Sequence, residues 1–178
     1  DVGCGYGNNL LPFAREKCAC YGVEVTGEIA EKTQSILNSF GIDAAIKEGR
    51  NSSIPFEADF FDLCISLNAL HYEKNEEQIM NALKEYCRVL KPDGALYLST
   101  VGPGHDIYKK AKVMGSHQFQ IQDYDFRDGE QYFYFSDLKY LEYYLKQFFA
   151  DIELGQVTEK LMTFDLDFLI AVCRNKLN

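Results

Sequence analysis

The sequence predicts an α/β fold with a doubly wound, mostly parallel seven-stranded sheet and an antiparallel hairpin at its C-terminal edge. Strand-like and helix-like segments alternate from residue 1 to about residue 100, which is typical of parallel sheets with right-handed crossovers. The segment 61–66 is almost continuously apolar, as in strands that are covered on both faces. Two strand-like segments near the C-terminus are joined by too few residues for a helix, which predicts the hairpin.

The first elements follow from local turn and cap residues. A strand ends at Val2, and Asn8 or Asn9 is a suitable N-cap for the helix that comes next. Pro12 falls in the first turn of that helix, where proline is tolerated. Residues 20–25 predict the following strand.

The middle of the chain continues the alternation. A second helix ends at Gly41 and places apolar side chains on one face: Ile29, Ile36, Leu37 and Phe40. Strands at 44–47 and 61–66 follow it. The third helix shows the same spacing in Ile79, Leu83, Tyr86, Cys87 and Leu90. The turn-forming residues 91–94 end this helix and lead into a strand over 95–101.

The C-terminal part departs from this alternating pattern. A helix is predicted over 136–149, because four apolar residues form one stripe: Leu138, Leu141, Leu145 and Phe148. Strands over 152–157 and 164–173 follow without room for a helix between them. They are therefore expected to pair as an antiparallel hairpin at the edge of the sheet.

Residues 102–135 are interpreted as an insertion on the substrate side of a single domain, 1–178. A short helix is expected around 108–114, and the segments 118–121 and 131–135 are expected to pair as strands. The insertion is rich in aromatic residues: Phe119, Tyr124, Phe126, Tyr132, Phe133, Tyr134 and Phe135. This composition predicts either a cover over the substrate or a small satellite core under a long loop.

Composition indicates an ordinary globular domain. Of 178 residues, 47% are hydrophobic and 25% are charged, and no apolar run approaches the ~18 residues of a membrane span. Lys and Arg number 18 against 27 Asp and Glu, so the net charge of −9 disfavours nucleic acid as a partner. The six cysteines form no C-x-x-C pair, which predicts inert thiols in a reducing cytoplasm and no metal site. Because the chain opens at Asp1 inside a motif, we expect upstream residues to be missing.

The chain begins with a glycine-rich loop. The segment DVGCGYG places a strand end, three alternating glycines and a helix start in sequence, so its backbone can turn sharply and approach a ligand. A dinucleotide loop needs its third glycine where Asn8 or Leu10 stands, and no Lys-Ser or Lys-Thr follows as in a P-loop. Glu24, at the end of the next strand, supplies a carboxylate that can accept hydrogen bonds from both hydroxyls of a ribose.

Together with three later segments, this loop resembles the motifs of class I S-adenosylmethionine-dependent methyltransferases. The later segments are GRNSSIPF at 49–56, FDLCISLNALHY at 61–72 and LKPDGALYLS at 90–99. The four motifs cover residues 1 to about 100, in order and with family-like gaps. The resemblance implies a Rossmann-like fold, S-adenosylmethionine as the cofactor and S-adenosylhomocysteine as the product.

The resemblance also implies a set of cofactor-binding residues near the carboxyl ends of the strands. They are Asp1, Gly3, Cys4, Gly5, Glu24, Val25, Asn51, Ser52, Leu67 and Asn68. The family usually has Asp where this chain has Arg50, so Asn51 or Ser52 is the predicted replacement at the adenine. Tyr6 and Tyr72 are predicted to face the substrate, and the Tyr6 ring is a candidate for a cation–π contact with the sulfonium. The alternative for Tyr6 is an ordinary solvent-facing loop residue.

His71 and His105 are the candidate catalytic bases. Both follow parallel strands at the ends where such sheets bind ligands, and histidine titrates near neutral pH. A base is needed only when the nucleophile arrives protonated. The alternatives are that His71 shapes the pocket and that His105 is a loop residue.

The predicted activity is in-line transfer of a methyl group to a small-molecule acceptor. The sequence lacks both the Pro-Pro-aromatic motif of nucleic-acid amino methylation and the Pro-Cys pair of cytosine methylation. Three alternatives stay open: a protein side chain as acceptor, an inactive cofactor-binding regulatory module, and a nicotinamide-dependent oxidoreductase. We expect a monomer or homodimer without a nucleic-acid or membrane partner.

Overall fold

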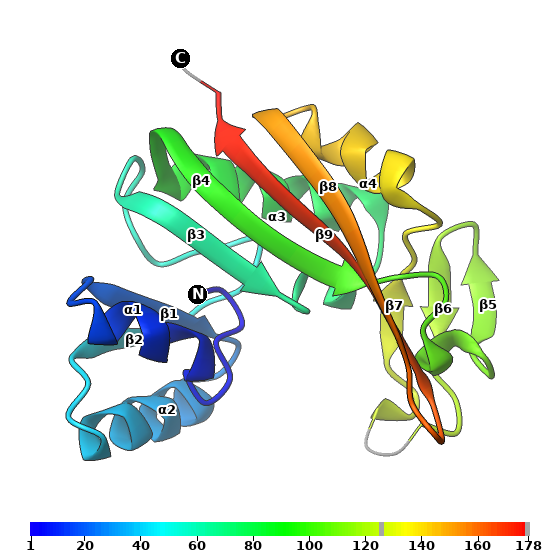
Figure 1. The fold of residues 1–178 in the computed structure, drawn as a ribbon, viewed down its shortest axis with the longest axis horizontal. Coiled ribbons are helices and arrows are strands. Elements are labelled where there is room, and N and C mark those ends of the chain that lie inside the picture. Colours follow the sequence, from blue (N-terminus) through cyan, green and yellow to red (C-terminus); the bar gives the residue numbers. More distant parts are fainter. Residues whose placement is uncertain (125–126, 177–178) are drawn as a thin grey trace.

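The computed structural model describes residues 1–124 and 127–176, and its central layer consists of two sheets (Figure 1). The larger sheet has the order β3-β4-β9-β8, and the smaller one pairs β1 with β2. These strands are β1 (Cys20–Glu24), β2 (Ala44–Glu48), β3 (Phe61–Leu67), β4 (Leu90–Val101), β8 (Phe149–Lys160) and β9 (Asp165–Asn175). β1–β2 and β3–β4 are parallel, whereas β9 is antiparallel to both β4 and β8.

Residues 1–2 join the two sheets. Val2 N donates to the Ile65 carbonyl at 2.8 Å, and Val23 N donates to the Asp1 carbonyl at 2.9 Å. The parallel pairs β1–β2 and β3–β4 confirm the predicted α/β, Rossmann-like arrangement. The antiparallel pair β8–β9 confirms the C-terminal hairpin. The prediction of a seven-stranded, mostly parallel sheet is wrong for the described residues. Two residues are too few for a strand at the joint, and the antiparallel β8 and β9 make the larger sheet mixed.

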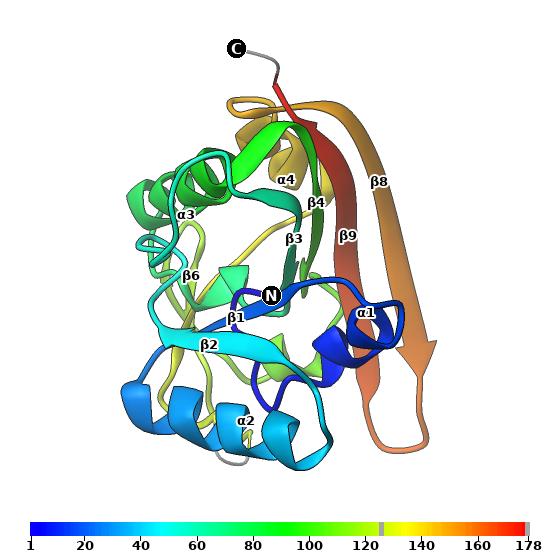
Figure 2. The same ribbon diagram turned by 90° about the vertical axis from the view of Figure 1, so that its left-hand side faces the viewer.

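Helices cover this layer. Their bounds are α1 (Leu11–Arg15), α2 (Gly27–Ser39), α3 (Glu76–Val89) and α4 (Leu138–Leu145), with 3-10 turns η1 (Asn8–Leu10), η2 (Leu70–Tyr72) and η3 (Asp106–Tyr108). α2 packs on β1 and β2, while α3 and α4 pack together on one face of the larger sheet (Figure 2). Within the parts of the chain that the structure describes, no helix is both long and apolar enough to cross a membrane.

The three longer helices begin at capping side chains. Thr26, Asn75 and Asp137 cap α2, α3 and α4 by accepting hydrogen bonds from backbone N–H groups. The prediction that Asn8 or Asn9 caps the first helix is wrong, because both residues lie inside η1. The Asn9 amide instead donates to the Asp1 carboxylate at 3.1 Å.

Two boundaries also differ from the prediction. The expected turn at 91–94 appears as a bulge inside β4, because the strand starts directly after Val89 but its pairing skips from Leu90 to Ala95. The helix expected over 136–149 is shorter, since α4 ends at Leu145 and Phe149 already pairs with Asn175 of β9.

The insertion forms a small antiparallel sheet of β5 (Lys112–Gly115), β6 (Gln118–Gln120) and β7 (Gln131–Phe133). The predicted pairing of its two strands is confirmed, with Gln118 opposite Phe133. The short helix expected around 108–114 is present only as the 3-10 turn η3, which ends at Tyr108, and 112–115 pairs with β6 as a strand instead. A satellite core of Val101, Ile107, Tyr108, Ile121 and Tyr132 lies beneath it. Phe126 lies outside the described residues.

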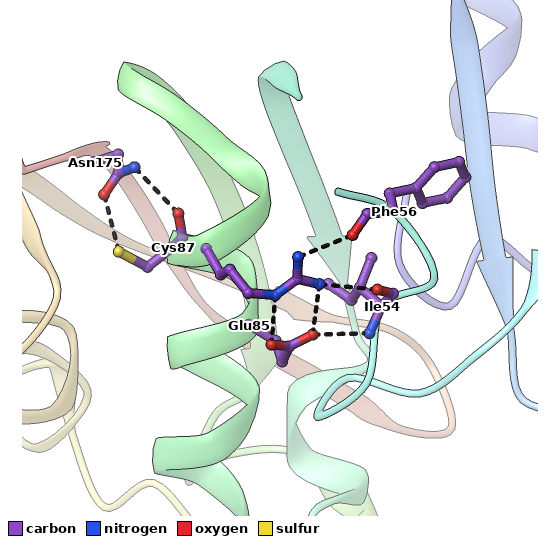
Figure 3. A network of polar contacts seen from close by, with 6 residues as sticks. Ile54, Phe56, Glu85, Cys87 and Asn175 are labelled. Carbon is purple, nitrogen blue, oxygen red and sulfur yellow. Dashed lines mark hydrogen bonds and ion pairs between the residues drawn. The ribbon is translucent and has the colours of Figure 1, made fainter. Parts of the chain in front are cut away.

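A polar network fixes the loop that follows β2. Arg88 of α3 donates to the carbonyls of Ile54 and Phe56, each at 2.9 Å, and pairs with Glu85 at 2.7 Å (Figure 3). Glu85 in turn accepts a hydrogen bond from Ile54 N at 3.0 Å. These bonds hold the loop against α3, and the cleft described next lies at the start of that loop.

Candidate active site

A cleft of about 890 Å³ opens beyond the carboxyl ends of β1, β2 and β3. Glu24 and Val25 line it from β1, Asn68 and Ala69 from the loop after β3, and the segment 49–52 from the loop after β2. Open α/β sheets bind ligands at this edge, and the volume suits a nucleotide-sized molecule. The tertiary structure therefore brings together the strand ends that the sequence motifs mark.

The glycine loop forms one wall of the cleft in left-handed backbone conformations. Gly3 has a φ of +74° and Gly5 a φ of +52°, values that favour glycine. A Cβ at Gly3 would lie 2.9 Å from the Ala69 Cβ, whereas one at Gly5 would meet nothing within 4 Å. Gly3 is therefore required for close packing, and Gly5 leaves open space beside the backbone for a ligand.

Glu24 stands at the tip of β1 with its carboxylate turned toward the glycine loop. Its side chain is 9% exposed. Oε1 accepts from Gly5 N at 2.5 Å, and Oε2 accepts from Val25 N at 3.1 Å. An ionised carboxylate has about four lone-pair positions, so these two bonds orient it and leave acceptor capacity toward the cleft.

The structure separates the predicted site residues into two groups. Those that line the cleft are Gly3, Gly5, Tyr6, Glu24, Val25, Asn51, Ser52, Asn68 and Tyr72. Asp1, Cys4, Leu67, His71 and His105 do not line it. Asp1 instead borders a separate, mainly apolar cavity of about 540 Å³ beside β1 and β3, and Cys4 is buried beneath Gly22 of β1.

Asn51 serves as a tether between loops. Its amide nitrogen donates to the Ala69 carbonyl at 3.1 Å and to Glu73 Oε1 at 3.0 Å. Its amide oxygen accepts from Tyr86 Oη at 2.7 Å. Both amide hydrogens are thus engaged within the protein. Glu73 was not among the predicted site residues, yet it lines the cleft, and burial raises the pKa of its carboxyl.

His71 is part of an aromatic cluster. It is 3% exposed, and its ring centroid lies 4.6 Å from each of the Tyr72 and Tyr132 rings. Its Nδ1 lies 3.4 Å from the Thr100 hydroxyl. Burial, with a smaller contribution from the charge of Arg127, lowers the pKa of His71 to about 3. The ring therefore stays neutral at physiological pH.

His105 caps η3. Its Nδ1 accepts a hydrogen bond from Ile107 N at 3.0 Å, and its ring packs 5.4 Å from Phe168. Burial lowers the pKa of this histidine as well. Its contacts are those of a structural loop residue, the alternative that the sequence left open.

Replacing His71 by Phe is expected to flatten the acid side of the stability profile. The unfolded histidine binds its proton near pH 6.5, whereas the folded one binds it only near pH 3. The contribution of neutral His71 to the free energy of unfolding is therefore complete above about pH 6.5. It is lost progressively as the pH falls toward 3, and the loss is about 2–3 kcal/mol at pH 4.5. Urea unfolding at pH 7.5 and pH 4.5 measures this loss, which should be smaller in His71→Phe. Equal losses in both proteins would contradict the assignment.

The insertion reaches the cleft through Arg127 and Glu130, two residues that the sequence did not single out. The Arg127 guanidinium lies 5.1 Å from the Tyr72 ring centroid and 3.3 Å from a carboxylate oxygen of Glu130. Tyr132 Oη donates to the same oxygen at 3.0 Å. This end of the cleft is consequently bounded by charged and aromatic groups of the insertion.

Comparison with known proteins identifies relatives of the chain. Residues 1–94 match the methyltransferase domain family. The human "Probable tRNA methyltransferase 9B" is 30% identical over 123 residues, which are 69% of this chain and 23% of that protein. "Sterol 4-C-methyltransferase strm-1" of Caenorhabditis elegans is 29% identical over 145 residues, 80% of this chain and 36% of that protein. A SAM-dependent methyltransferase structure from Methanosarcina mazei has a TM-score of 0.79 at 20% identity, covering 100% of this chain and 92% of that chain.

The fold and the cleft define an α/β domain with a cleft of nucleotide size at the carboxyl ends of its parallel strands. The chain belongs to the methyltransferase domain family. Its fold is shared with the class of S-adenosylmethionine-dependent methyltransferases. The chain spans less than half the length of the curated relatives named here. S-adenosylmethionine is the cofactor of this class, and the residues present fit it. The open space at Gly5 and the spare acceptor capacity of Glu24 form a cradle for an adenosyl group.

Proposed function

We propose that this domain methylates a small-molecule acceptor. The observation that carries the proposal is the end wall of the cleft, where Tyr72 of η2 meets Arg127 and Glu130 of the insertion. Side chains from two separate parts of the chain therefore enclose the space beside the proposed cofactor site. An enclosed space of this kind favours a compact acceptor over a long polymer. The net charge of −9 also repels a phosphate backbone.

Each part of the cleft has a role in this proposal. When bound, S-adenosylmethionine supplies a methyl group activated by a sulfonium. The glycine loop and Asn68 hold the amino-acid part, and Glu24 accepts hydrogen bonds from the ribose hydroxyls. Tyr72 and Arg127 orient the acceptor and exclude water. His71 is a poor candidate for the general base, because a group with a pKa of about 3 accepts a proton poorly at neutral pH.

A tRNA acceptor is the second candidate. It is favoured by the 30% identity to the human protein named as a tRNA methyltransferase. Basic residues also occur in the cleft: Lys32, Arg50, Lys74 and Arg127. Acidic residues accompany them in equal number, namely Glu24, Glu28, Glu73 and Glu130, so the cleft carries no basic excess. Phosphate binding requires such an excess, which is why the small molecule is preferred.

Transfer of a tritiated methyl group separates these candidates. The purified protein is incubated with labelled S-adenosylmethionine and, in parallel, with a metabolite extract, total tRNA or a protein extract. We expect label in the metabolite fraction and a strong loss with Glu24→Ala, while Glu48→Ala serves as the control. Label confined to tRNA or to protein would reassign the acceptor. Cofactor binding without transfer in any fraction would support the inactive regulatory module.

A further inference from the structure

Two buried side chains of α2 contact the glycine loop. The Thr33 hydroxyl donates a hydrogen bond to the Gly5 carbonyl, with 2.6 Å between the two oxygens. A Cβ at Gly7 would lie 2.9 Å from the Leu37 Cδ2. Thr33 and Leu37 are four residues apart and therefore lie on the same face of the helix. The glycine loop thus runs along α2 and meets it at two points that are one helical turn apart.

Thr33 is the polar member of the buried side of α2. Its side chain is fully buried, and a buried hydroxyl is unfavourable unless it has a hydrogen-bond partner. A threonine within a helix can find that partner in the carbonyl one turn earlier. Among the hydrogen bonds between described residues, however, the Thr33 hydroxyl makes only the one to Gly5. Valine has nearly the same branched shape, so packing alone does not explain the hydroxyl, whereas the bond to the loop does.

Gly5 is held from two sides. Its N–H donates to Glu24 Oε1 at 2.5 Å, while its carbonyl accepts from Thr33. Gly5 is exposed, and nothing lies within 4 Å of the position that a Cβ would take. A glycine with this much space samples many backbone conformations unless hydrogen bonds fix it. The Cys4 thiol also approaches the Gly5 carbonyl, but at 4.0 Å this contact is too weak to fix it.

We propose that Thr33 is a positioning residue for the cofactor, because its hydroxyl fixes the Gly5 carbonyl and so holds the glycine loop in the shape that the ligand meets. Thr33 does not line the cleft, so it acts through Gly5 and not by touching the ligand. A loop that is ordered in advance lowers the conformational entropy that binding would otherwise cost. The inference rests on the proposed function only in requiring that the cofactor binds against the glycine loop.

Two substitutions separate the hydroxyl of Thr33 from its methyl group. Thr33→Val removes the hydroxyl and keeps the branched shape, whereas Thr33→Ser keeps the hydroxyl and removes a buried methyl. Isothermal titration calorimetry with S-adenosylhomocysteine is expected to show binding weakened about three- to tenfold in Thr33→Val and affinity within about twofold of wild type in Thr33→Ser. Thr33→Ser should still melt at a lower temperature, because the missing methyl leaves a cavity. A purely structural role would therefore weaken binding in Thr33→Ser as well.

Hydrogen exchange in the free protein gives a second measurement that needs no ligand. The Gly5 amide is expected to exchange faster in Thr33→Val than in wild type, and at the wild-type rate in Thr33→Ser. Ser39→Ala is the matched control, since it removes a hydroxyl from the same helix. Ser39 Oγ donates to the Ile36 carbonyl at 2.7 Å, and Ser39 is exposed and does not line the cleft. This control should change neither the affinity nor the exchange of Gly5.

The outcomes separate this inference from the proposed function. Wild-type affinity in Thr33→Val, or equal weakening in Thr33→Val and Thr33→Ser, would overturn the role of Thr33 and leave the methyltransferase proposal standing. Failure of the wild-type protein to bind S-adenosylhomocysteine would overturn both. A loss of affinity in Ser39→Ala equal to that in Thr33→Val would also overturn the inference, because any hydroxyl removed from α2 would then have the same effect.

Discussion

Glu24→Ala is expected to weaken binding of S-adenosylhomocysteine by about five- to 150-fold, or about 1–3 kcal/mol. Two losses combine in this variant. The ribose hydroxyls lose a charged acceptor, and the N–H groups of Gly5 and Val25 lose the carboxylate that now accepts from them at 2.5 and 3.1 Å. Isothermal titration of the cofactor product gives the affinity directly.

Glu48→Ala is the matched control for this change. Glu48 pairs in register with Glu24 at the end of the neighbouring strand, but it is exposed and does not line the cleft. Its removal should leave the affinity within twofold of wild type. If Glu24→Ala also bound the ligand with unchanged affinity, the ribose role of this carboxylate would be wrong.

Gly3→Ala is expected to lower the affinity for S-adenosylhomocysteine by at least tenfold and to lower the melting temperature by several degrees. The new Cβ would lie 2.9 Å from the Ala69 Cβ, and the φ of +74° is unfavourable for alanine. The backbone strain costs about 1–2 kcal/mol, and the overpacking adds about 1–3 kcal/mol. The glycine loop or the Ala69 segment must shift to relieve the contact, and both line the cleft, so affinity and stability are expected to fall together.

Two further variants separate strain from crowding at Gly3. Gly5→Ala introduces strain alone, because nothing lies within 4 Å of its Cβ, and it should cost less stability. The double variant Gly3→Ala with Ala69→Gly removes the crowding and should recover part of the stability lost in Gly3→Ala. No recovery in the double variant would show that the close approach to Ala69 is not what requires a glycine here.

The sequence predicted the elements whose periodicity is set by burial within one segment. The strand at 61–66 and the helix carrying Ile79, Leu83 and Tyr86 appear as β3 and α3, although Leu90, which was expected on the helix, begins β4. It failed at 108–114, where a helix was expected, because β5 exists only through its pairing with β6. That pairing is a contact between segments, and local propensity does not report it.

The candidate site divides in the same way. The glycine loop and Glu24 were found from their spacing and their place at strand ends, and the segment 49–52 was found from its resemblance to the family motif; all of them line the cleft. Glu73 and Arg127 gave no such signal. Glu73 is fixed by a hydrogen bond from Asn51, 22 residues away, and Arg127 reaches the cleft from the insertion.

From the sequence alone we could predict the α/β fold, the glycine loop and the carboxylate at the tip of β1, because strand and turn propensities act between near neighbours in the chain. The contacts between distant segments, by contrast, bury His71 in its neutral form, make Asn51 a tether, and bring Glu73 and Arg127 into the lining of the cleft. The burial of a side chain and its hydrogen-bond partners depend on which distant segments of the chain meet. Burial and partners then set the protonation state of the side chain and the number of hydrogen-bond acceptors that it has left.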